Sequence, residues 1–207
     1  MRSHRDRGAG HRHRRLRAGP AGGVNVANGV SVRRATRDDA ASIAGIHVDA
    51  WRHNYRGLID DDTLVSLDAA SKVETWREAL ADDASVFVAS RGSDMLGWVR
   101  TGPFRQTEEA RPEVGAMTPG WAELHGFYVS PRAQRQGVGS ALWHRAHRWC
   151  LDQGYRDVGL WVLAGNVVAI RFYASCGFRD LELDQNFEIA GQALVEKLMA
   201  RRLDPVS

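Results

Sequence analysis

The sequence lacks the long apolar runs and the paired cysteines that would place it among membrane proteins or disulfide-rich secreted proteins. No apolar run approaches the roughly 18–20 residues that a membrane-spanning helix needs, so the sequence predicts no membrane span. The chain has only two cysteines, Cys150 and Cys176, and they form no Cys-x-x-Cys pair. Such sparse cysteine use indicates a reducing compartment, and we expect a cytoplasmic protein.

Metal-ligand patterns are missing as well. His144 and His147 lie three residues apart, as two ligands on one helix can, but no third ligand joins them at a recognisable spacing. We interpret this pair as part of a solvated helix face and expect no metal site.

Acidic residues are scarce at the N-terminus. Residues 1–20 hold seven arginines against one aspartate, whereas the formal net charge of the whole chain is only +3. Few apolar residues are available here to offset the entropy of ordering, so we expect residues 1–29 to form a disordered Arg-rich tail and linker. A nucleic-acid-binding arm is the alternative. Charge runs of this kind are usually solvated, and we expect no nucleic-acid partner.

The rest of the chain, residues 30–207, is expected to form a single domain, since the chain has 207 residues and a domain has roughly 100–200. With 43% hydrophobic and 26% charged residues, the composition is that of an ordinary globular protein. Periodicity predicts strands at residues 30–35, 85–90, 95–100, 122–129, 157–163, 180–183 and 187–198. It predicts helices at residues 36–51, 58–67, 71–80 and 141–149, and another that begins at Asn166. Residues 101–120 show little periodicity and are expected to form a long loop over a substrate site. This order predicts an α/β (α+β mixed) fold with a mixed sheet.

The most informative stretch begins with the strand at residues 122–129. It is followed by Gln134-Arg135-Gln136-Gly137-Val138-Gly139-Ser140 and then by a helix. Glycine lets the backbone approach a phosphate closely, and the free N–H groups of the first helical turn can bind it. The lysine of a nucleoside-triphosphate loop and the third glycine of a dinucleotide fingerprint are both absent. We therefore predict a pyrophosphate site of another kind.

A second stretch carries a linked pattern. The strand at residues 157–163 precedes Gly165-Asn166, which begins a helix ending in Phe172-Tyr173-Ala174-Ser175-Cys176-Gly177-Phe178. The first stretch, with its Gln/Arg-x-x-Gly-x-Gly/Ala pattern, and this second one together resemble the two signatures of the GNAT superfamily of N-acetyltransferases. The resemblance covers residues 32–199.

The resemblance implies a co-substrate, acetyl-coenzyme A (acetyl-CoA), and the residues that bind it. It implies a twisted mixed sheet with helices on both faces, in which the fourth and fifth strands splay and leave a slot. Phe127, Tyr128 and Val129 would hold the pantetheine arm. The pyrophosphate would be held by Gln134, Arg135, Gln136, Gly137, Val138, Gly139 and Ser140. Asn166 would bond the cofactor or cap its own helix.

Acetyl transfer to an amine needs a proton acceptor for the amine and a proton donor for the departing thiolate. The resemblance implies Glu123 as the general base and Tyr173 as the proton donor. Strand alternation predicts one face made of Glu123, His125, Phe127 and Val129. His125 is then the alternative base, or it tunes Glu123. Gly126 would allow a bulge that frees a backbone N–H for the thioester or the pantetheine arm.

No motif in the sequence identifies the amine acceptor. The resemblance implies that the first helices form a wall of its site, and we expect Trp51, Tyr55, His125 and Trp98 to face it. Trp51 would otherwise anchor its helix in the core. A small-molecule amine and a peptide amine are both compatible acceptors. An exposed last strand would allow pairing with a second copy as a homodimer.

The function predicted from these features is an acetyl-CoA-dependent N-acetyltransferase. It would transfer the acetyl group to a primary amine by direct attack in a ternary complex, because no cysteine lies where a nucleophile would be needed. The alternatives are a protein N-terminal or lysine acetyltransferase and a non-catalytic acyl-CoA-binding regulatory module.

Overall fold

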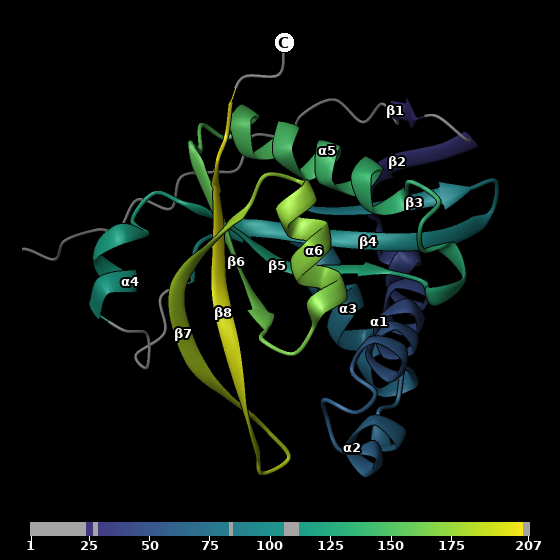
Figure 1. Cartoon of the computed structure of the whole chain (residues 1–207). Helices are drawn as coiled ribbons and strands as arrows, with labels where there is room; N and C mark the ends of the chain where they lie inside the picture. The colour runs from purple at the N-terminus through teal and green to yellow at the C-terminus, as the bar shows by residue number, and fades with distance from the viewer. Residues whose placement is uncertain (1–23, 27–28, 83–84, 106–111, 205–207) are drawn as a thin grey trace, which may run out of the picture.

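One β-sheet runs through the domain in the computed structural model, which describes residues 24–26, 29–82, 85–105 and 112–204 (Figure 1). The strands are β1 (Val24–Val26), β2 (Val30–Arg34), β3 (Val86–Arg91), β4 (Asp94–Pro103), β5 (Ala122–Val129), β6 (Asp157–Leu163), β7 (Arg179–Ile189) and β8 (Gln192–Arg202). They lie in the order β1-β2-β3-β4-β5-β6-β8-β7, and all neighbours are antiparallel except β5 and β6. The predicted mixed sheet is confirmed.

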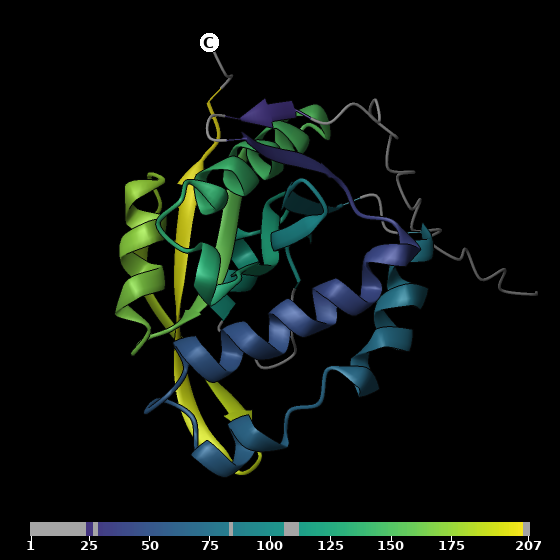
Figure 2. The same cartoon turned by 90° about the vertical axis from the view of Figure 1, so that its right-hand side faces the viewer.

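Helices cover both faces of this sheet, as the two views in Figures 1 and 2 show. The α-helices are α1 (Ala40–Asn54), α2 (Asp61–Ser66), α3 (Ala70–Asp82), α4 (Pro112–Met117), α5 (Val138–Asp152) and α6 (Val167–Ser175). Short 3-10 helices lie at Arg37–Asp39 and Pro131–Ala133. The helices α1 and α3 pack on one face of the sheet, and α5 and α6 pack on the other.

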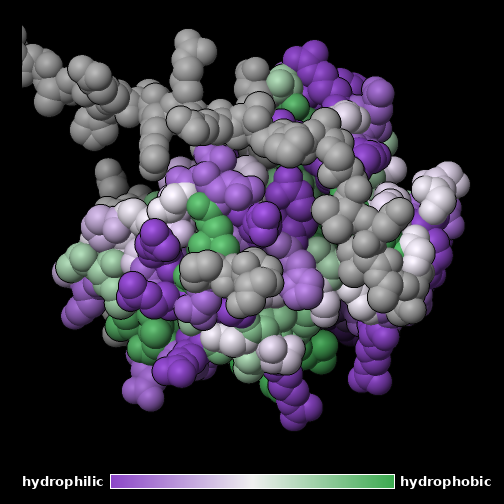
Figure 3. All heavy atoms as spheres, turned by 90° about the horizontal axis from the view of Figure 1, so that it is seen from above, coloured by the Kyte–Doolittle hydropathy of each residue, from purple (hydrophilic) through white to green (hydrophobic). Residues whose placement is uncertain are grey.

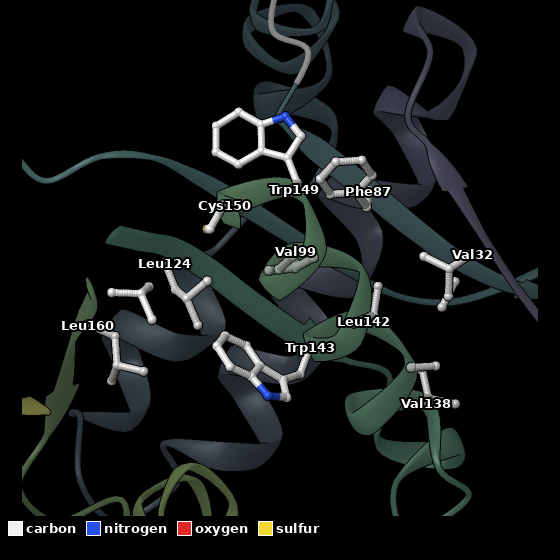
Figure 4. Close-up of a cluster of buried hydrophobic side chains, with 14 of the residues drawn as sticks. Val32, Phe87, Val99, Leu124, Val138, Leu142, Trp143, Trp149, Cys150 and Leu160 are labelled. Atoms are coloured by element: carbon white, nitrogen blue, oxygen red, sulfur yellow. The ribbon is translucent and has the colours of Figure 1, made fainter. Parts of the chain in front are cut away.

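The largest hydrophobic core lies between the sheet and α5 (Figure 4). The helix turns Leu142, Trp143 and Trp149 towards the strands, each no more than 4% exposed. Their spacing over two turns forms the apolar stripe of a helix that packs on a sheet. They meet strand residues such as Phe87 and Val99. This packing holds the first turn of α5 at the ends of the central strands.

The slot opens where β5 and β6 part. These two strands pair at only two positions, Ala122 with Val158 and Glu123 with Gly159. Further along, β6 keeps its pairing with β8 up to Leu163, while β5 continues beside β4 to Val129. The predicted fourth and fifth strands are β5 and β6, since β1 was not predicted. The predicted splayed slot is therefore confirmed, and it opens at the carboxyl ends of both strands.

The structure adds two elements to the predicted order. Residues 24–26 were expected in a flexible linker but form β1, which pairs with β2. The rest of the predicted tail, residues 1–23 and 27–28, lies outside the described residues. The expected loop at 101–120 contains the end of β4 and the helix α4, whose Val114 packs against Phe104 and Leu198. The loop prediction is wrong there, because a buried valine anchors α4.

The last two strands form a long hairpin. The prediction of one strand at residues 187–198 is wrong, because the chain turns at Ala190 and Gly191, whose φ angles are 50° and 81°. Two consecutive positive φ angles are typical of the tight turns that join antiparallel strands. The hairpin extends past the sheet towards α2 (Figure 1). There the Gln192 side chain donates to the carbonyl of Leu58 and accepts from the N–H of Asp60.

The surface seen from above is mostly hydrophilic, with hydrophobic residues in small separate areas (Figure 3). This distribution is expected when most large apolar side chains lie inside the domain. Within the described part of the chain, no helix is long and apolar enough to cross a membrane.

Candidate active site

The glycine loop joins β5 to α5 at the open end of the slot. Gly137 is the N-cap of α5 and has a φ angle of 81°, a conformation that strains residues with a Cβ. The first turn of the helix begins directly after it. Its N–H groups have no acceptor within the helix, which is the arrangement that binds phosphate groups.

Gly139 is needed because α6 approaches the loop closely. A Cβ at this position would lie 3.0 Å from the ring of Phe172. Asn166 caps α6 by accepting the N–H of Ala169 at 3.1 Å. The two stretches that carry the sequence signatures therefore lie against each other in the fold.

A cleft of about 480 Å³ lies between the glycine loop, α6 and the end of β5, and we call it the loop cleft. Its lining is His53, Asn54, Phe127, Val129, Gln134, Arg135, Gly137, Gly139, Ser140, Asn166, Val168, Ala169, Phe172 and Tyr173. All of the residues predicted to bind acetyl-CoA are among them except Tyr128, Gln136 and Val138.

The side chains of these three residues lie elsewhere. Val138 is 1% exposed and packs in the core, so only its backbone belongs to the loop. Gln136 accepts a hydrogen bond from Arg91 at 3.1 Å. Tyr128 lies on the other face of β5, where its ring stacks on His47 with centroids 4.9 Å apart. Their side chains therefore do not line the loop cleft, and cofactor binding by these three residues stays a prediction for their main-chain groups.

A bulge interrupts β5 at the predicted glycine. Arg100 and Thr101 are neighbours on β4, yet they pair with Gly126 and Leu124. His125 is therefore the extra residue of the bulge. A Cβ on Gly126 would lie 2.8 Å from an indole ring on β4, so this position needs glycine. The predicted bulge is confirmed.

The bulge also changes which side chains share a face. Leu124 belongs to the core beneath α5, and beyond the bulge Phe127 and Val129 pack against the same core. The prediction that Glu123 shares a face with Phe127 and Val129 is therefore wrong. Glu123 instead shares its face with Tyr128, towards α1.

A second cleft of about 380 Å³ lies on that side, and we call it the hairpin cleft. Its lining is Trp51, Asn54, Tyr55, Ile59, Arg105, Glu123, Leu124, His125, Gly126, Phe127, Tyr128, Trp161, Val162, Leu163, Asn166, Ala169, Tyr173, Gln185 and Glu196. The two clefts share Asn54, Phe127, Asn166, Ala169 and Tyr173. They are therefore continuous through the slot.

Aromatic residues of α1 and its C-cap form one wall of the hairpin cleft. The indole N–H of Trp51 donates to the hydroxyl of Tyr128 at 2.9 Å, and the rings of Trp51 and Tyr55 meet edge to face at 5.1 Å. Burial raises the pKa of Tyr55 well above its usual value and also raises the pKa of Tyr128. Both hydroxyls are therefore protonated at neutral pH.

Trp98 does not reach the cleft. Its side chain is 2% exposed and packs between His47 and Trp76, in the core beneath α1 and α3. Its ring occupies the space that the missing side chain of Gly126 leaves free. The prediction that Trp98 faces the acceptor is wrong.

Glu123 is held by Arg105. Its side chain is 1% exposed and accepts the backbone N–H of Arg105 at 2.8 Å and the guanidinium at 2.5 Å. Both carboxylate oxygens take part in these contacts. Charge-assisted pairs of this kind are strong. Arg105 therefore engages both oxygens of the Glu123 carboxylate.

His125 lies beside this pair. Its Nε2 is 3.8 Å from the Glu123 carboxylate and 3.0 Å from the carbonyl of Pro103. A carbonyl can only accept, so Nε2 carries the hydrogen in that contact and is not free to act as a base. Burial lowers the pKa of His125, and the nearby Glu123 charge opposes that effect.

Tyr173 lies where the clefts meet. Its ring packs against Phe127 with centroids 6.1 Å apart and against Phe178 at 5.7 Å. Burial raises the pKa of its hydroxyl far above the usual value, so the phenol is protonated at neutral pH.

Four polar residues of the hairpin cleft were not predicted as site residues from the sequence. They are Asn54, Arg105, Gln185 and Glu196. Strand alternation could have placed Glu196 among the inward-facing residues of the last strand. That inference was not possible because the hairpin turn before this strand was not predicted. Among the described residues, no cluster of three or more His, Cys, Asp or Glu is placed to hold a metal.

Comparison with known proteins gives the same assignment as the two signatures. Residues 43–178 match the Acetyltransferase (GNAT) family. The chain is 32% identical over 167 residues to the uncharacterized N-acetyltransferase YuaI of Bacillus subtilis (strain 168), covering 81% of this chain and 90% of that protein.

Two solved structures share the fold. One is a ribosomal-protein-alanine N-acetyltransferase from Brucella melitensis, with 26% identity, a TM-score of 0.64, and coverage of 83% of this chain and 99% of that one. The other is yncA, a putative acetyltransferase from Salmonella typhimurium with its cofactor acetyl-CoA, with 21% identity, a TM-score of 0.63, and coverage of 86% and 96%.

The predictions of fold, of acetyl-CoA as co-substrate and of N-acetyltransfer are thus confirmed at the level of the family. The roles of single residues stay predictions. On the match over residues 43–178 and the shared fold, this chain belongs to the acetyltransferase (GNAT) family, whose members are acetyl-CoA-dependent N-acetyltransferases.

Proposed function

We propose that the chain transfers the acetyl group of acetyl-CoA to a primary amine by direct attack, with both substrates bound at once. The observation that supports this is the continuity of the two clefts, which meet at Phe127 and Tyr173. Acetyl-CoA would occupy the loop cleft and the amine the hairpin cleft. Holding both reactants at one junction removes much of the entropic barrier to their reaction.

The loop cleft suits the charged part of acetyl-CoA. The pyrophosphate would bind the N–H groups of the first turn of α5, with the helix dipole behind them and the positive charge of Arg135 beside them. The pantetheine arm would run along the main chain at Phe127 and Val129. The bulge at Gly126 would supply a backbone N–H to the thioester.

Tyr173 is the proposed proton donor to the departing thiolate. Burial raises its pKa, so the hydroxyl carries a proton at neutral pH. It would donate that proton to the sulfur while the carbon–sulfur bond breaks, and it would regain one from the acetylated nitrogen. The proton acceptor for the amine would be a carboxylate of the hairpin cleft, which contains Glu123 and Glu196.

A peptide amine is the second candidate acceptor. The Brucella melitensis protein of similar fold is named for acetylation of a ribosomal-protein alanine, and it is 26% identical to this chain. A small-molecule amine remains our first choice, because the hairpin cleft is only about 380 Å³.

The first experiment is thermal unfolding of the full chain with and without acetyl-CoA. Binding to the folded state alone stabilises it by roughly 2.7 kcal/mol at a hundred times the dissociation constant, so the midpoint should rise. A panel of primary amines, including short peptides, is then tested with thiol release as the readout. An unchanged midpoint with acetyl-CoA and with longer acyl-CoA esters would refute the proposal.

The variant Tyr173→Phe separates catalysis from binding. It should lower kcat by about 100-fold, because the thiolate loses its proton donor, while the midpoint rise with acetyl-CoA is kept. Tyr155→Phe is the control, since Tyr155 lines neither cleft. Full midpoint rise with no turnover of any amine, in the unmodified chain, would favour a regulatory acyl-CoA-binding module instead.

A further inference from the structure

We propose that Glu196 is the carboxylate that accepts the proton of the attacking amine, and that Glu123 is a positioning residue that holds Arg105. This inference rests on the proposed function and assigns the base within the same site. It departs from the sequence prediction, in which Glu123 was the general base.

The fold brings Glu196 to the slot from the far end of the chain. It lies on β8, opposite Leu163, the last residue of β6, at the end where β6 and β5 have parted. On β8, Leu194 packs against the same buried cluster as Trp51 and Tyr55. Glu196, two residues further along β8 and therefore on the same face of the strand, lines the hairpin cleft.

Electrostatic contacts across the cleft show which groups Glu196 faces. Burial is the main cause of the raised pKa values of Tyr55 and Tyr128, which lie on the opposite wall, and the charge of Glu196 raises both pKa values further. Burial raises the pKa of Glu196 itself, the charge of Glu123 raises it further, and Arg105 opposes both effects. Among the described residues, these are the charged and titratable groups whose fields act between Glu196 and the neighbouring walls.

The two carboxylates differ in how free they are to take a proton. Within the described residues, Glu196 receives one hydrogen bond, from Gln185 to its Oε2 at 2.9 Å, and it is only half-buried. Glu123 is 1% exposed, and both its oxygens contact Arg105. Glu196 can therefore meet an incoming ammonium group, whereas Glu123 would first have to lose its partner.

The cleft around Glu196 favours a cationic acceptor. Trp51, Tyr55 and Trp161 line it, and aromatic faces attract ammonium groups. Gln185 lies directly opposite Glu196 on β7 and fixes the orientation of the carboxylate through its amide. The acceptor would thus bind as an ammonium ion next to the group that deprotonates it.

The nitrogen of the acceptor loses two protons during the transfer. The ammonium gives one proton to Glu196, and the freed lone pair of the nitrogen attacks the thioester carbonyl carbon. The carbon–sulfur bond breaks, and the thiolate takes the proton of Tyr173. The nitrogen, now bonded to the acetyl carbon, loses its second proton to the tyrosinate. Glu196 releases its proton to solvent, which restores the site.

The test is the pH dependence of kcat in the full chain, with an amine that the unmodified protein acetylates. Glu196 must be ionised to accept a proton, so kcat should fall at low pH as Glu196 becomes protonated. Glu196→Gln should lower kcat by about 100-fold or more and remove this fall. Glu196→Asp keeps a carboxylate, so it should retain the fall with a smaller loss of kcat.

Glu123→Gln and Glu188→Gln complete the set. Glu123→Gln should raise the KM for the amine by loosening Arg105 but keep the fall of kcat at low pH. Glu188 is exposed on the same hairpin and lines neither cleft, so Glu188→Gln should change nothing. The acetyl-CoA midpoint rise, measured for every variant, shows that each one folds and binds.

The inference is overturned if Glu196→Gln folds, binds acetyl-CoA and keeps both kcat and its fall at low pH. It is equally overturned if Glu123→Gln, and not Glu196→Gln, removes that fall. Failure of the unmodified chain to bind acetyl-CoA or to acetylate any amine is a different result, because it refutes the proposed function itself and the inference with it.

Discussion

The two clefts are built in different ways. The loop cleft takes most of its lining from two short segments, the end of β5 with the glycine loop and the first turns of α6, and it offers main-chain N–H groups. The hairpin cleft takes its lining from the helices α1 and α6, the strands β5 to β8, and the segments after α1 and β4, and it offers side chains. A site made of backbone leaves a local sequence pattern, whereas a site made of distant side chains leaves none.

The difference between the clefts also concerns what keeps each one in shape. Around the loop cleft, the positive φ of Gly137 and the contact between Gly139 and Phe172 leave little choice of residue. Around the hairpin cleft, the shape depends on hydrogen bonds such as that from Trp51 to Tyr128 and on the contact of the hairpin with α2. Substitutions should therefore affect the clefts separately.

The largest expected effect is that of Gly137→Trp. A side chain at this position meets open space in the loop cleft and would occupy the phosphate site, besides straining the backbone. The midpoint rise with acetyl-CoA should vanish, which at a hundred times the dissociation constant means a loss of roughly 2.7 kcal/mol of ligand stabilisation.

Gly92→Trp is the matched control for this change. Gly92 also has a positive φ, 59°, and open space around it, but it lies in the turn between β3 and β4 and lines neither cleft. This variant should lose stability from strain and still show the full midpoint rise. Equal loss of the rise in both variants would mean that strain, and not the phosphate site, explains the result.

The second effect concerns pH and the wall of the hairpin cleft. Burial lowers the pKa of His47 from 6.5 to about 4, and its ring stacks on Tyr128. Below pH 6.5 the unfolded chain binds a proton at His47 that the folded chain does not. The free energy of unfolding should therefore fall by about 2 kcal/mol from this residue between pH 6.5 and pH 5.

His47→Phe tests this assignment, because it keeps an aromatic ring but cannot be protonated. Denaturant unfolding between pH 5 and pH 7 should show a shallower loss of stability than in the unmodified chain. Some loss should remain, since burial also lowers the pKa values of His125 and His147. If the free energy of unfolding of the folded variant fell with pH as steeply as in the unmodified chain, His47 would not be the residue responsible.

The smallest effect is expected for Gln192→Ala. This change removes two hydrogen bonds that join the hairpin to the segment before α2, at Leu58 and Asp60, and should cost about 1 kcal/mol of stability. The KM for the amine should rise a few-fold, while the midpoint rise with acetyl-CoA stays the same. A change in acetyl-CoA binding with no change in the amine KM would contradict this prediction, because it would mean that the contact shapes the loop cleft and not the hairpin cleft.

Several features of the fold and site could be read from the sequence. The strand, glycine loop and helix around Gly137, the capping role of Asn166 and the bulge at Gly126 follow from local patterns, whereas the splayed slot follows from the family resemblance. The structure contains all of them. The face of β5 was misassigned, because strict alternation has no place for the extra residue His125. That one residue moved Phe127 and Val129 to the other face of the strand.

Most of the hairpin cleft could not be predicted from the sequence. The turn at Ala190 and Gly191 was missed, since the residues around it continue an apolar pattern that resembles one strand. Because this turn was missed, no prediction placed Glu196 near Tyr55 or Glu123. The ion pair between Glu123 and Arg105 was equally invisible, because nothing in the sequence relates these two positions.

The sequence by itself determined the family, the co-substrate and the loop that would bind its phosphates, because backbone conformations and helix ends depend on residues close together in the chain. Only the tertiary structure decided which carboxylate is paired with Arg105 and which aromatic rings line the hairpin cleft. Those properties depend on burial and on contacts between strands far apart in sequence, and the free energies of such contacts exist only once the sheet has formed.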